Sequence, residues 1–277
     1  MAANLQLLKR RIKTASNIAQ VARSMEMISA SKIKRAQTAV ENNKPYAEKI
    51  TGLASNILRH VDRDKIKNPY IDGNASDKKL LIIISSDKGL CGSLNTNLFK
   101  KLLEVENKNL KILALGKKSH IFSSRLSGEF ITGMNLGTTI PPYSLVFRLI
   151  EIINQEFLSG AVGEVQILYN VFSSIFSQVP TLKTILPVRV EQSETDILPY
   201  IFEPDAEQII EALLPYYVET ALYAALLEAF TSEQAARMVS MQNAKNNALD
   251  IADYLTLSYN KSRQERITNE LLSLNSN

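Results

Sequence analysis

The chain has 277 residues, which is enough for one large domain or two modest ones. Its 32 Lys and Arg against 28 Asp and Glu give a formal net charge of +4, and 45% hydrophobic residues exclude a disordered chain. A single cysteine, Cys91, excludes an internal disulfide, and its separation in sequence from His60 and His120 argues against a zinc site. The start, MAANLQLLKRR, lacks the apolar segment of a secretory signal, and no apolar run approaches the roughly 20 residues of a membrane span. These features predict a soluble intracellular protein.

The two ends of the chain are predicted to be long helices. Neither Gly nor Pro occurs in the first 44 residues or in the last 62, whereas every glycine lies between Gly52 and Gly163. Along both ends, apolar and small residues recur at spacings of three and four, which is typical of a packed helical stripe. The stripes include Leu5, Leu8, Ile12, Ala15, Ala19, Ala22 and Met25 at one end, and Ala235, Met238, Met241, Ala248, Ala252 and Leu255 at the other.

These stripes predict an antiparallel coiled coil of residues 1–62 and 206–277, because small residues let two helices approach closely. The alternative is two amphipathic helices folded back on one compact core. Pro45 is expected to kink or restart the first helix, and Pro215 to mark the start of the second.

The middle of the chain has a different pattern, with short β-branched runs that alternate with amphipathic segments. Strands are predicted at Lys79–Ser86, Leu110–Leu115, Glu164–Phe172 and Thr181–Val188, and helices at Leu94–Val105 and Tyr143–Leu158. This alternation predicts a mostly parallel, Rossmann-like α/β domain over residues 75–200, inserted between the two terminal helices.

Positive charge is concentrated at the N-terminal end. Residues 1–40 contain eight Lys and Arg, among them Lys32, Lys34 and Arg35, against the single acid Glu26, for a net charge of +7. Such a helix fits nucleic acid, an anionic lipid or an acidic protein partner, whereas a solvated helix face accounts for only four or five of these charges. The lack of aromatic residues in positions 1–45 disfavours a nucleic-acid-binding coiled coil, which remains the main rival interpretation.

No convincing catalytic, metal or cofactor site is visible in the sequence. The turn at Ser85–Ser93 follows a predicted strand, where α/β proteins often bind phosphates, but its glycines Gly89 and Gly92 match neither nucleotide-binding glycine motif. A nucleotide-binding enzyme is therefore a second, weaker rival. Cys91 has no adjacent base, and the carboxylates of Glu26, Glu41, Glu228 and Glu233 are interpreted as solvated groups on helices.

The C-terminal helix is polar at Gln242–Asn247 and again at Asn260–Arg266. The second segment is expected to extend beyond the shorter N-terminal helix, which favours contact with a partner.

Four segments together resemble one family. Met25–Gln37 (MEMISASKIKRAQ) resembles the N-terminal signature of the γ subunit of F-type ATP synthase, and Ser85–Leu94 resembles its central turn. Ser232–Met241 and Tyr259–Gln264 resemble its C-terminal helix, and the four motifs occur in the family's order over nearly the whole chain.

The resemblance implies a non-catalytic central-stalk rotor that couples proton flow to ATP synthesis or hydrolysis. A single copy would turn inside a ring of three α and three β subunits, against the ε subunit and the membrane ring of c subunits, at the cytoplasmic face of a bacterial inner membrane. The resemblance also implies that nucleotides bind on the ring, so that the shaft itself needs no cofactor.

The resemblance further assigns roles to individual positions. Arg263, Gln264 and Thr268 match polar contacts to the ring, whereas Ile267 and Leu271 match a tip inside an apolar sleeve. Met25 matches a position packed against the second helix, and Met238 lies on the facing stripe. Independently of the resemblance, the net charge of residues 1–40 predicts that Lys32, Lys34 and Arg35 contact an acidic partner surface.

Overall fold

In a computed structural model, the protein is described for residues 2–60, 68–105, 109–126, 128–188, 203 and 205–274. The fold divides into two compact units, Met1–Ser31 with Arg237–Asn277 (unit 1) and Lys32–Ala236 (unit 2). Two helices belong to both units, namely α1 (Ala2–His60) and α6 (Ala206–Leu274). The predicted domain limits at residues 62 and 200 lie outside the described residues, so those boundaries remain a prediction.

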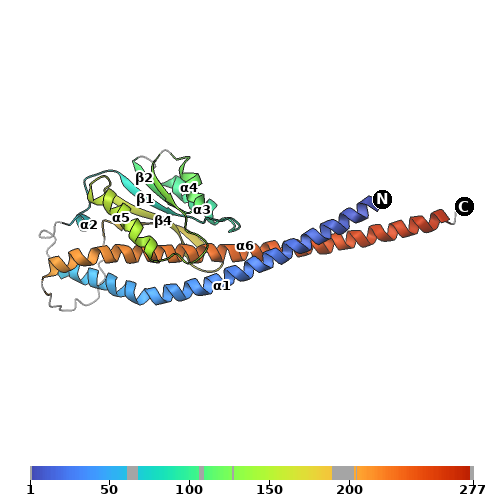
Figure 1. The fold of residues 1–277 in the computed structure, drawn as a ribbon, viewed down its shortest axis with the longest axis horizontal. Helices are drawn as coiled ribbons and strands as arrows, with labels where there is room; N and C mark the ends of the chain where they lie inside the picture. Colours follow the sequence, from blue (N-terminus) through green and yellow to red (C-terminus); the bar gives the residue numbers. More distant parts are fainter. Residues whose placement is uncertain are drawn as a thin grey trace. The chain divides into compact units, whose positions relative to one another are not determined.

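Unit 2 contains a five-stranded sheet in the order β3-β2-β1-β4-β5 (Figure 1). The strands are β1 (Lys79–Ile84), β2 (Leu110–Leu115), β3 (Glu129–Met134), β4 (Glu164–Phe172) and β5 (Gln178–Leu186). Three of the four pairings are parallel, and only β4 with β5 is antiparallel. The predicted mostly parallel α/β class is therefore confirmed.

Helices cover both faces of this sheet, because side chains alternate across a strand. On one face, Leu80 and Ile82 of β1 join a core built by α5 (Ser144–Leu158), α6 and the end of α1. On the other face, Leu81 and Ile83 pack with α3 (Leu94–Glu104). The remaining helices are the short α2 (Pro69–Asp72) and α4 (Lys117–Ser123).

Unit 1 is a pair of helices that run in opposite directions side by side (Figure 1). In α1 the buried positions are small, namely Ala15, Ala19, Ala22 and Ser29, and in α6 they include Met241 and Ala248. This 3-4 spacing of small residues is the predicted coiled-coil stripe, and it permits close approach of the two backbones.

Pro215 does not mark the start of its helix as predicted, and the first helix does not restart at Pro45, where a kink remains a prediction. α1 continues through Pro45 and α6 through Pro215, which lies ten residues inside its helix rather than at the start. A proline inside a helix costs about 3 kcal/mol or more, because one hydrogen bond is lost and the ring crowds the preceding turn. Residues buried on each side of the proline, such as Leu214 and Val218 in α6, offset this cost by anchoring the helix to the core.

Three elements, α2, α4 and β3, were not predicted. β3 is an edge strand with no buried residue and with a glycine, Gly133, so it lacks the apolar run that marked β1. The fifth strand starts three residues earlier than predicted and contains Pro180, which an edge strand tolerates because one side of it forms no ladder.

Two glycines give opposite predictions for replacement by alanine. Gly116, between β2 and α4, has φ of +96°, and an added Cβ would lie 2.2 Å from the backbone oxygen of Ser85. Gly52 lies inside α1 with open space around it. We expect Gly52→Ala to raise the free energy of unfolding by about 0.5–1 kcal/mol.

In contrast, Gly116→Ala is expected to lower the free energy of unfolding by more than about 3 kcal/mol. Alanine disfavours the positive φ at this position, and its Cβ would clash with the backbone of Ser85. Chemical denaturation of the two variants and the wild type measures both effects. Equal stabilities for the two variants would contradict the described path of the chain at Gly116.

Candidate functional site

An ion pair joins the two helices in the seam of unit 1. The Nζ atom of Lys245 donates to the carboxylate of Glu26 at 2.8 Å, and both side chains are about four-fifths buried, with exposed fractions of 23% and 21%. The interpretation of Glu26 as a solvated carboxylate was therefore wrong. The only acid among the first 40 residues compensates a lysine that occupies the opposite stripe.

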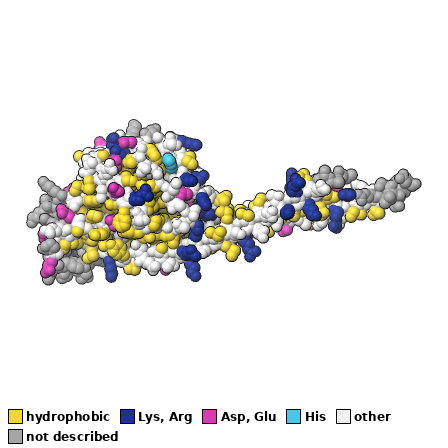
Figure 2. Space-filling model, viewed as in Figure 1, with side chains coloured by type: hydrophobic (Ala, Val, Ile, Leu, Met, Phe, Trp, Pro, Cys, Tyr) yellow, Lys and Arg dark blue, Asp and Glu magenta, His cyan; other side chains and the backbone are white. Residues whose placement is uncertain are grey.

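The outer surface of unit 1 is unusually apolar for a helix pair. Twelve large hydrophobic side chains have exposed fractions of 46% or more: Leu7, Ile18, Val21, Met27, Ile28, Leu249, Ile251, Tyr254, Leu257, Ile267, Leu271 and Leu272. They lie on both helices, and Figure 2 shows hydrophobic and basic side chains interspersed on the face in view. Single exposed hydrophobic residues are ordinary, but a dense set along one element marks a surface that a partner covers.

The residues assigned to the tip all lie on this outer surface. Arg263, Gln264 and Thr268 are exposed, and the Thr268 hydroxyl donates to the Gln264 carbonyl of its own helix at 3.0 Å. Ile267 and Leu271 are 48% and 58% exposed. Their positions fit a partner contact, which remains a prediction. Met25 and Met238 are partly buried.

The basic residues of α1 fall into two groups. Lys34 and Arg35 are exposed, as are the five basic residues nearer the N-terminus. Lys32 differs, because it is partly buried and its Nζ atom donates to the Thr138 carbonyl of the loop after β3. The structure therefore separates Lys32, which binds within unit 2, from its two basic neighbours.

The turn at Ser85–Ser93 is bound tightly to its own surroundings. Asn95 of α3 donates to the Ser86 hydroxyl at 2.8 Å, and the Asp87 carboxylate accepts from the backbone N–H groups of Lys117 and Gly137. Cys91 is 3% exposed. The polar groups of this turn therefore form hydrogen bonds to α3, to the start of α4 and to the loop after β3.

The carboxyl ends of β1 and β4 meet where parallel sheets of this type usually bind ligands, because the strand order reverses there. In this protein α6 crosses that place, and Ala229, Phe230 and Glu233 line what remains of the crevice. The remaining cavity of about 10 Å³ has the size of a single water molecule. A nucleotide does not fit at this position.

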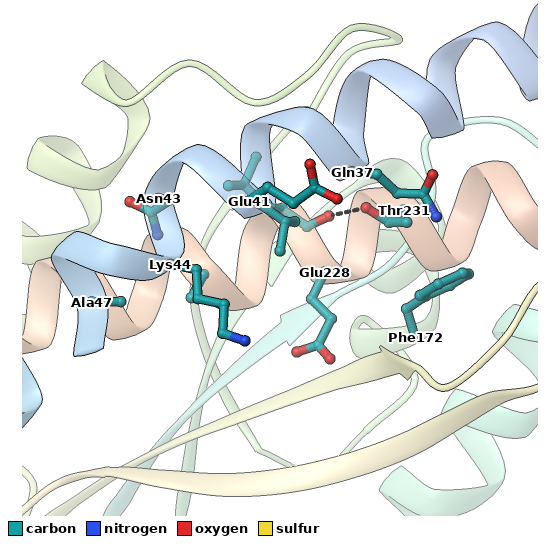
Figure 3. A pocket seen from close by; sticks show the side chains of 11 residues that line it. Gln37, Glu41, Asn43, Lys44, Ala47, Phe172, Glu228 and Thr231 are labelled. Atoms are coloured by element: carbon teal, nitrogen blue, oxygen red, sulfur yellow. Dashed lines mark hydrogen bonds between the residues drawn. The ribbon is translucent and has the colours of Figure 1, made fainter.

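A larger pocket of about 450 Å³ lies between α1, α6 and the end of β4 (Figure 3). Its walls include Val40, Phe172 and Leu227, and its polar groups include Glu41, Lys44 and Glu228. In Figure 3 the carboxylate of Glu228 points toward the strands, whereas the Thr231 hydroxyl donates to its own helix at 2.8 Å, to Leu227.

Burial raises the pKa of the Glu228 carboxyl, and hydrogen bonds from Tyr169 and from the Phe172 backbone partly oppose this shift. Burial likewise raises the pKa of Tyr169, with the charge of Glu228 as the second cause. Glu228 is therefore partly buried and hydrogen-bonded rather than solvated, and Glu233, at 8% exposure, is buried. Within the described part of the chain, no group of His, Cys, Asp and Glu is arranged to hold a metal ion.

A sequence family described as ATP synthase matches residues 4–276. A protein named ATP synthase gamma chain from Dehalococcoides mccartyi is 39% identical over 280 residues, with 98% of this chain and 97% of that protein covered. A second protein of that name, from Brevibacillus brevis, is 34% identical over 278 residues, covering 98% and 96%. The chain belongs to the family of ATP synthase gamma chains. The family expected from the four motifs is confirmed, and neither rival interpretation is supported.

Solved structures confirm the fold of this chain. A chain from the Euglena gracilis mitochondrial ATP synthase, in a structure of its OSCP, F1 and c-ring, is 20% identical with a TM-score of 0.72, covering 99% of this chain and 93% of that one. A chain from the Tetrahymena thermophila central stalk and c-ring is 23% identical with a TM-score of 0.60, covering 81% and 99%.

One helix of this gamma chain is long and apolar enough to cross a membrane, by length and composition alone. The apolar stretch lies in α6 between Gln208 and Asn269, where an 18-residue window has a mean hydropathy of 1.2. The apolar residues of α6 within unit 2, among them Leu214, Leu222 and Leu226, are buried in the core over the sheet. Of the apolar window, 39% is buried, so core packing accounts for part of the apolar character of this helix.

The raised pKa of Glu228 predicts a pH-dependent stability. Above its ordinary pKa of 4.5, the folded protein holds this proton more strongly than the unfolded chain does, so the contribution of Glu228 to stability falls as pH rises through that range. Glu228→Gln removes the titration but keeps a hydrogen-bond acceptor. We expect the melting temperature of the variant, relative to wild type, to increase between roughly pH 4 and pH 7.

The matched control is Glu41→Gln, at an exposed position on the same pocket. Its melting temperature is expected to stay parallel to wild type over the same range. Parallel curves for Glu228→Gln would instead show that burial has no effect on this carboxyl.

Proposed function

We propose that this chain is the non-catalytic central rotor of an F-type ATP synthase, with unit 1 as the shaft inside a ring of α and β subunits. The observation that carries the proposal is the outer surface of unit 1, where twelve large hydrophobic side chains on both helices are exposed. A coiled coil that functions in water needs an apolar seam only, so these residues require a partner that surrounds the pair. Membership in the family of ATP synthase gamma chains supports a ring of α and β subunits as that partner.

The α/β domain is proposed to stand at the foot, against the ε subunit and the c-ring, at the cytoplasmic face of a bacterial membrane. Membrane association then requires no inserted segment of this chain, because the c-ring supplies it. Lys34 and Arg35, both exposed, are proposed to face acidic groups of the β subunits.

The mechanism follows from symmetry. Three identical sites around a threefold ring are equivalent until a single asymmetric shaft contacts each of them differently. Moving a two-state site from 1:99 to 99:1 requires roughly 5.5 kcal/mol of differential interaction. Linkage makes the effect reciprocal, so that nucleotide state biases shaft angle and shaft angle biases nucleotide affinity.

Burial of the shaft is tested by thiol labelling, since the native cysteine Cys91 is buried. Leu257→Cys and Tyr254→Cys, at positions 70% exposed, are expected to react rapidly with a maleimide in the isolated chain and at least about tenfold more slowly in the assembled complex. Ile121→Cys, at a 58% exposed position of α4, reports on general changes in reactivity. Unchanged labelling at 254 and 257 in the complex contradicts the shaft proposal.

The polar cluster at the tip gives a prediction for catalysis. Arg263→Ala combined with Gln264→Ala removes two exposed groups, so the isolated chain should unfold as the wild type does. In the complex, a hydrogen bond left unmade at a buried contact costs about 1–3 kcal/mol. ATP turnover of the assembled complex is therefore expected to fall at least about tenfold.

The matched control changes Glu265 and Arg266 to alanine, in the same helical turn. Its turnover is expected to remain near that of the wild type. Wild-type turnover in the Arg263/Gln264 variant, at normal assembly, would exclude a role for this cluster in coupling.

A further inference from the structure

Asn170 of β4 carries a buried polar atom that needs a hydrogen-bond partner. The residue is 3% exposed, and among the described residues no group donates a hydrogen bond to its side-chain Oδ1 atom. A buried acceptor of this kind is rare in folded proteins, because it gives up a hydrogen bond to water on folding and gains none in return.

The backbone of Asn170, in contrast, is held from two sides. In the ladder with β5, Asn170 lies opposite Pro180, which has no backbone N–H to donate. The Asn170 carbonyl accepts a hydrogen bond from the buried Ser232 hydroxyl of α6 at 2.8 Å. Strand and helix therefore fix the place of this residue, and its side chain stays away from bulk water.

Asn170 lines the small cavity beyond the carboxyl end of β1. The pairing of β1 with β4 ends at Leu168, two residues before Asn170. Because side chains alternate across a strand, the Asn170 side chain shares the face of Leu168, which packs with α3. Leu94, the first residue of α3, also lines the cavity. Gln166, whose Oε1 atom likewise accepts no hydrogen bond from the described residues, does not line it.

The size and the walls of this cavity suit one water molecule. Its volume of about 10 Å³ is close to the least that a single water requires, and it excludes any larger ligand. A buried water typically forms about three hydrogen bonds. Besides Asn170, the walls carry the polar side chains of Ser85, Ser86 and Glu233, so enough groups surround the cavity to bind a water.

The Ser86 hydroxyl is the wall group best suited to donate a hydrogen bond to such a water. Its oxygen accepts from the Asn95 side chain at 2.8 Å, which leaves its own O–H as a donor. The Cys91 sulfur, at 3.7 Å, is a weak alternative partner for that proton. Ser86 thus offers a donor, and Asn170 an acceptor, on the wall of the same cavity.

We propose that one water molecule is bound in this cavity, where it donates to the Asn170 Oδ1 atom and accepts from the Ser86 hydroxyl. The water joins β4 to the turn after β1 at the place where α6 crosses the sheet, and it gives the buried amide the partner it needs. The proposal does not depend on the rotor function, since all of these residues lie within unit 2.

The direct test is a crystal structure of the full-length chain at a resolution that shows ordered water. An oxygen peak about 2.5–3.0 Å from both the Asn170 Oδ1 atom and the Ser86 hydroxyl is the expected result. A cavity without a peak, or a direct hydrogen bond from a protein group to Oδ1, overturns the proposal. A peak that gains an anomalous signal after transfer of the crystal to rubidium chloride identifies a monovalent cation and also overturns it.

A double-mutant cycle tests the same contact in solution. Ala229 of α6 is 8% exposed and lines the cavity, so the methyl groups added by Ala229→Val displace the water. This displacement leaves Oδ1 unpaired in the wild-type background but not in the Asn170→Leu background, which has no acceptor there. In chemical denaturation, Ala229→Val is therefore expected to raise the unfolding equilibrium constant at least about fivefold more in the wild-type background.

The matched control is Ala225→Val, about one turn earlier on α6, at a position that is 3% exposed and does not line the cavity. Its effect is expected to be the same in both backgrounds. Equal effects of Ala229→Val in the two backgrounds show that no bound water is displaced, and they overturn the proposal. Where Ala229→Val does not fold, the crystal structure of the wild type decides alone.

Discussion

The structure depends on one helix, α6, that packs against two different hydrophobic surfaces in succession. Within unit 2 it is a core helix, with Ile210, Leu214, Val218 and Leu222 fully buried over the sheet. Within unit 1 only a narrow stripe, represented by Met241 and Ala248, is buried against α1. A helix that leaves a domain must find a new apolar partner or expose its side chains. Both occur in unit 1, because one stripe of α6 is buried against α1 while other apolar side chains of the helix are exposed.

The sequence predicted the central strands well because burial on both faces gives an unmistakable pattern. Leu80–Ile84 is a continuous apolar run, and all of it is buried between two layers of helices. The edge strand β3 gives no such signal, since its burial is only partial. Pro215 misled the interpretation for a different reason. Proline is a strong local signal, but packing over many residues on both sides of it outweighs one lost hydrogen bond.

The polar contacts were beyond sequence reasoning because they join distant positions. Glu26 and Lys245 are 219 residues apart, and each alone looks like an ordinary charged residue on a helix. Lys32 and Thr138 are separated by 106 residues, so nothing near Lys32 reveals that its ammonium is bound inside the chain. The exposed tip residues were accessible only through the family resemblance, since the residues themselves indicate no more than a polar helix end.

The energetics of coupling explain why the shaft surface combines apolar and basic groups. An exposed ion pair contributes about 0–1 kcal/mol, so three or four pairs together fall short of the roughly 5.5 kcal/mol that a full two-state shift requires. Burial of one large apolar side chain contributes about 1.5–3 kcal/mol. Under the proposed rotor function, two or three of the apolar side chains on unit 1, in contact at one shaft angle and exposed at another, would supply the required difference. In the same proposal, charge would serve chiefly to set which face of the shaft meets which partner, since electrostatic complementarity fixes register more than it adds affinity.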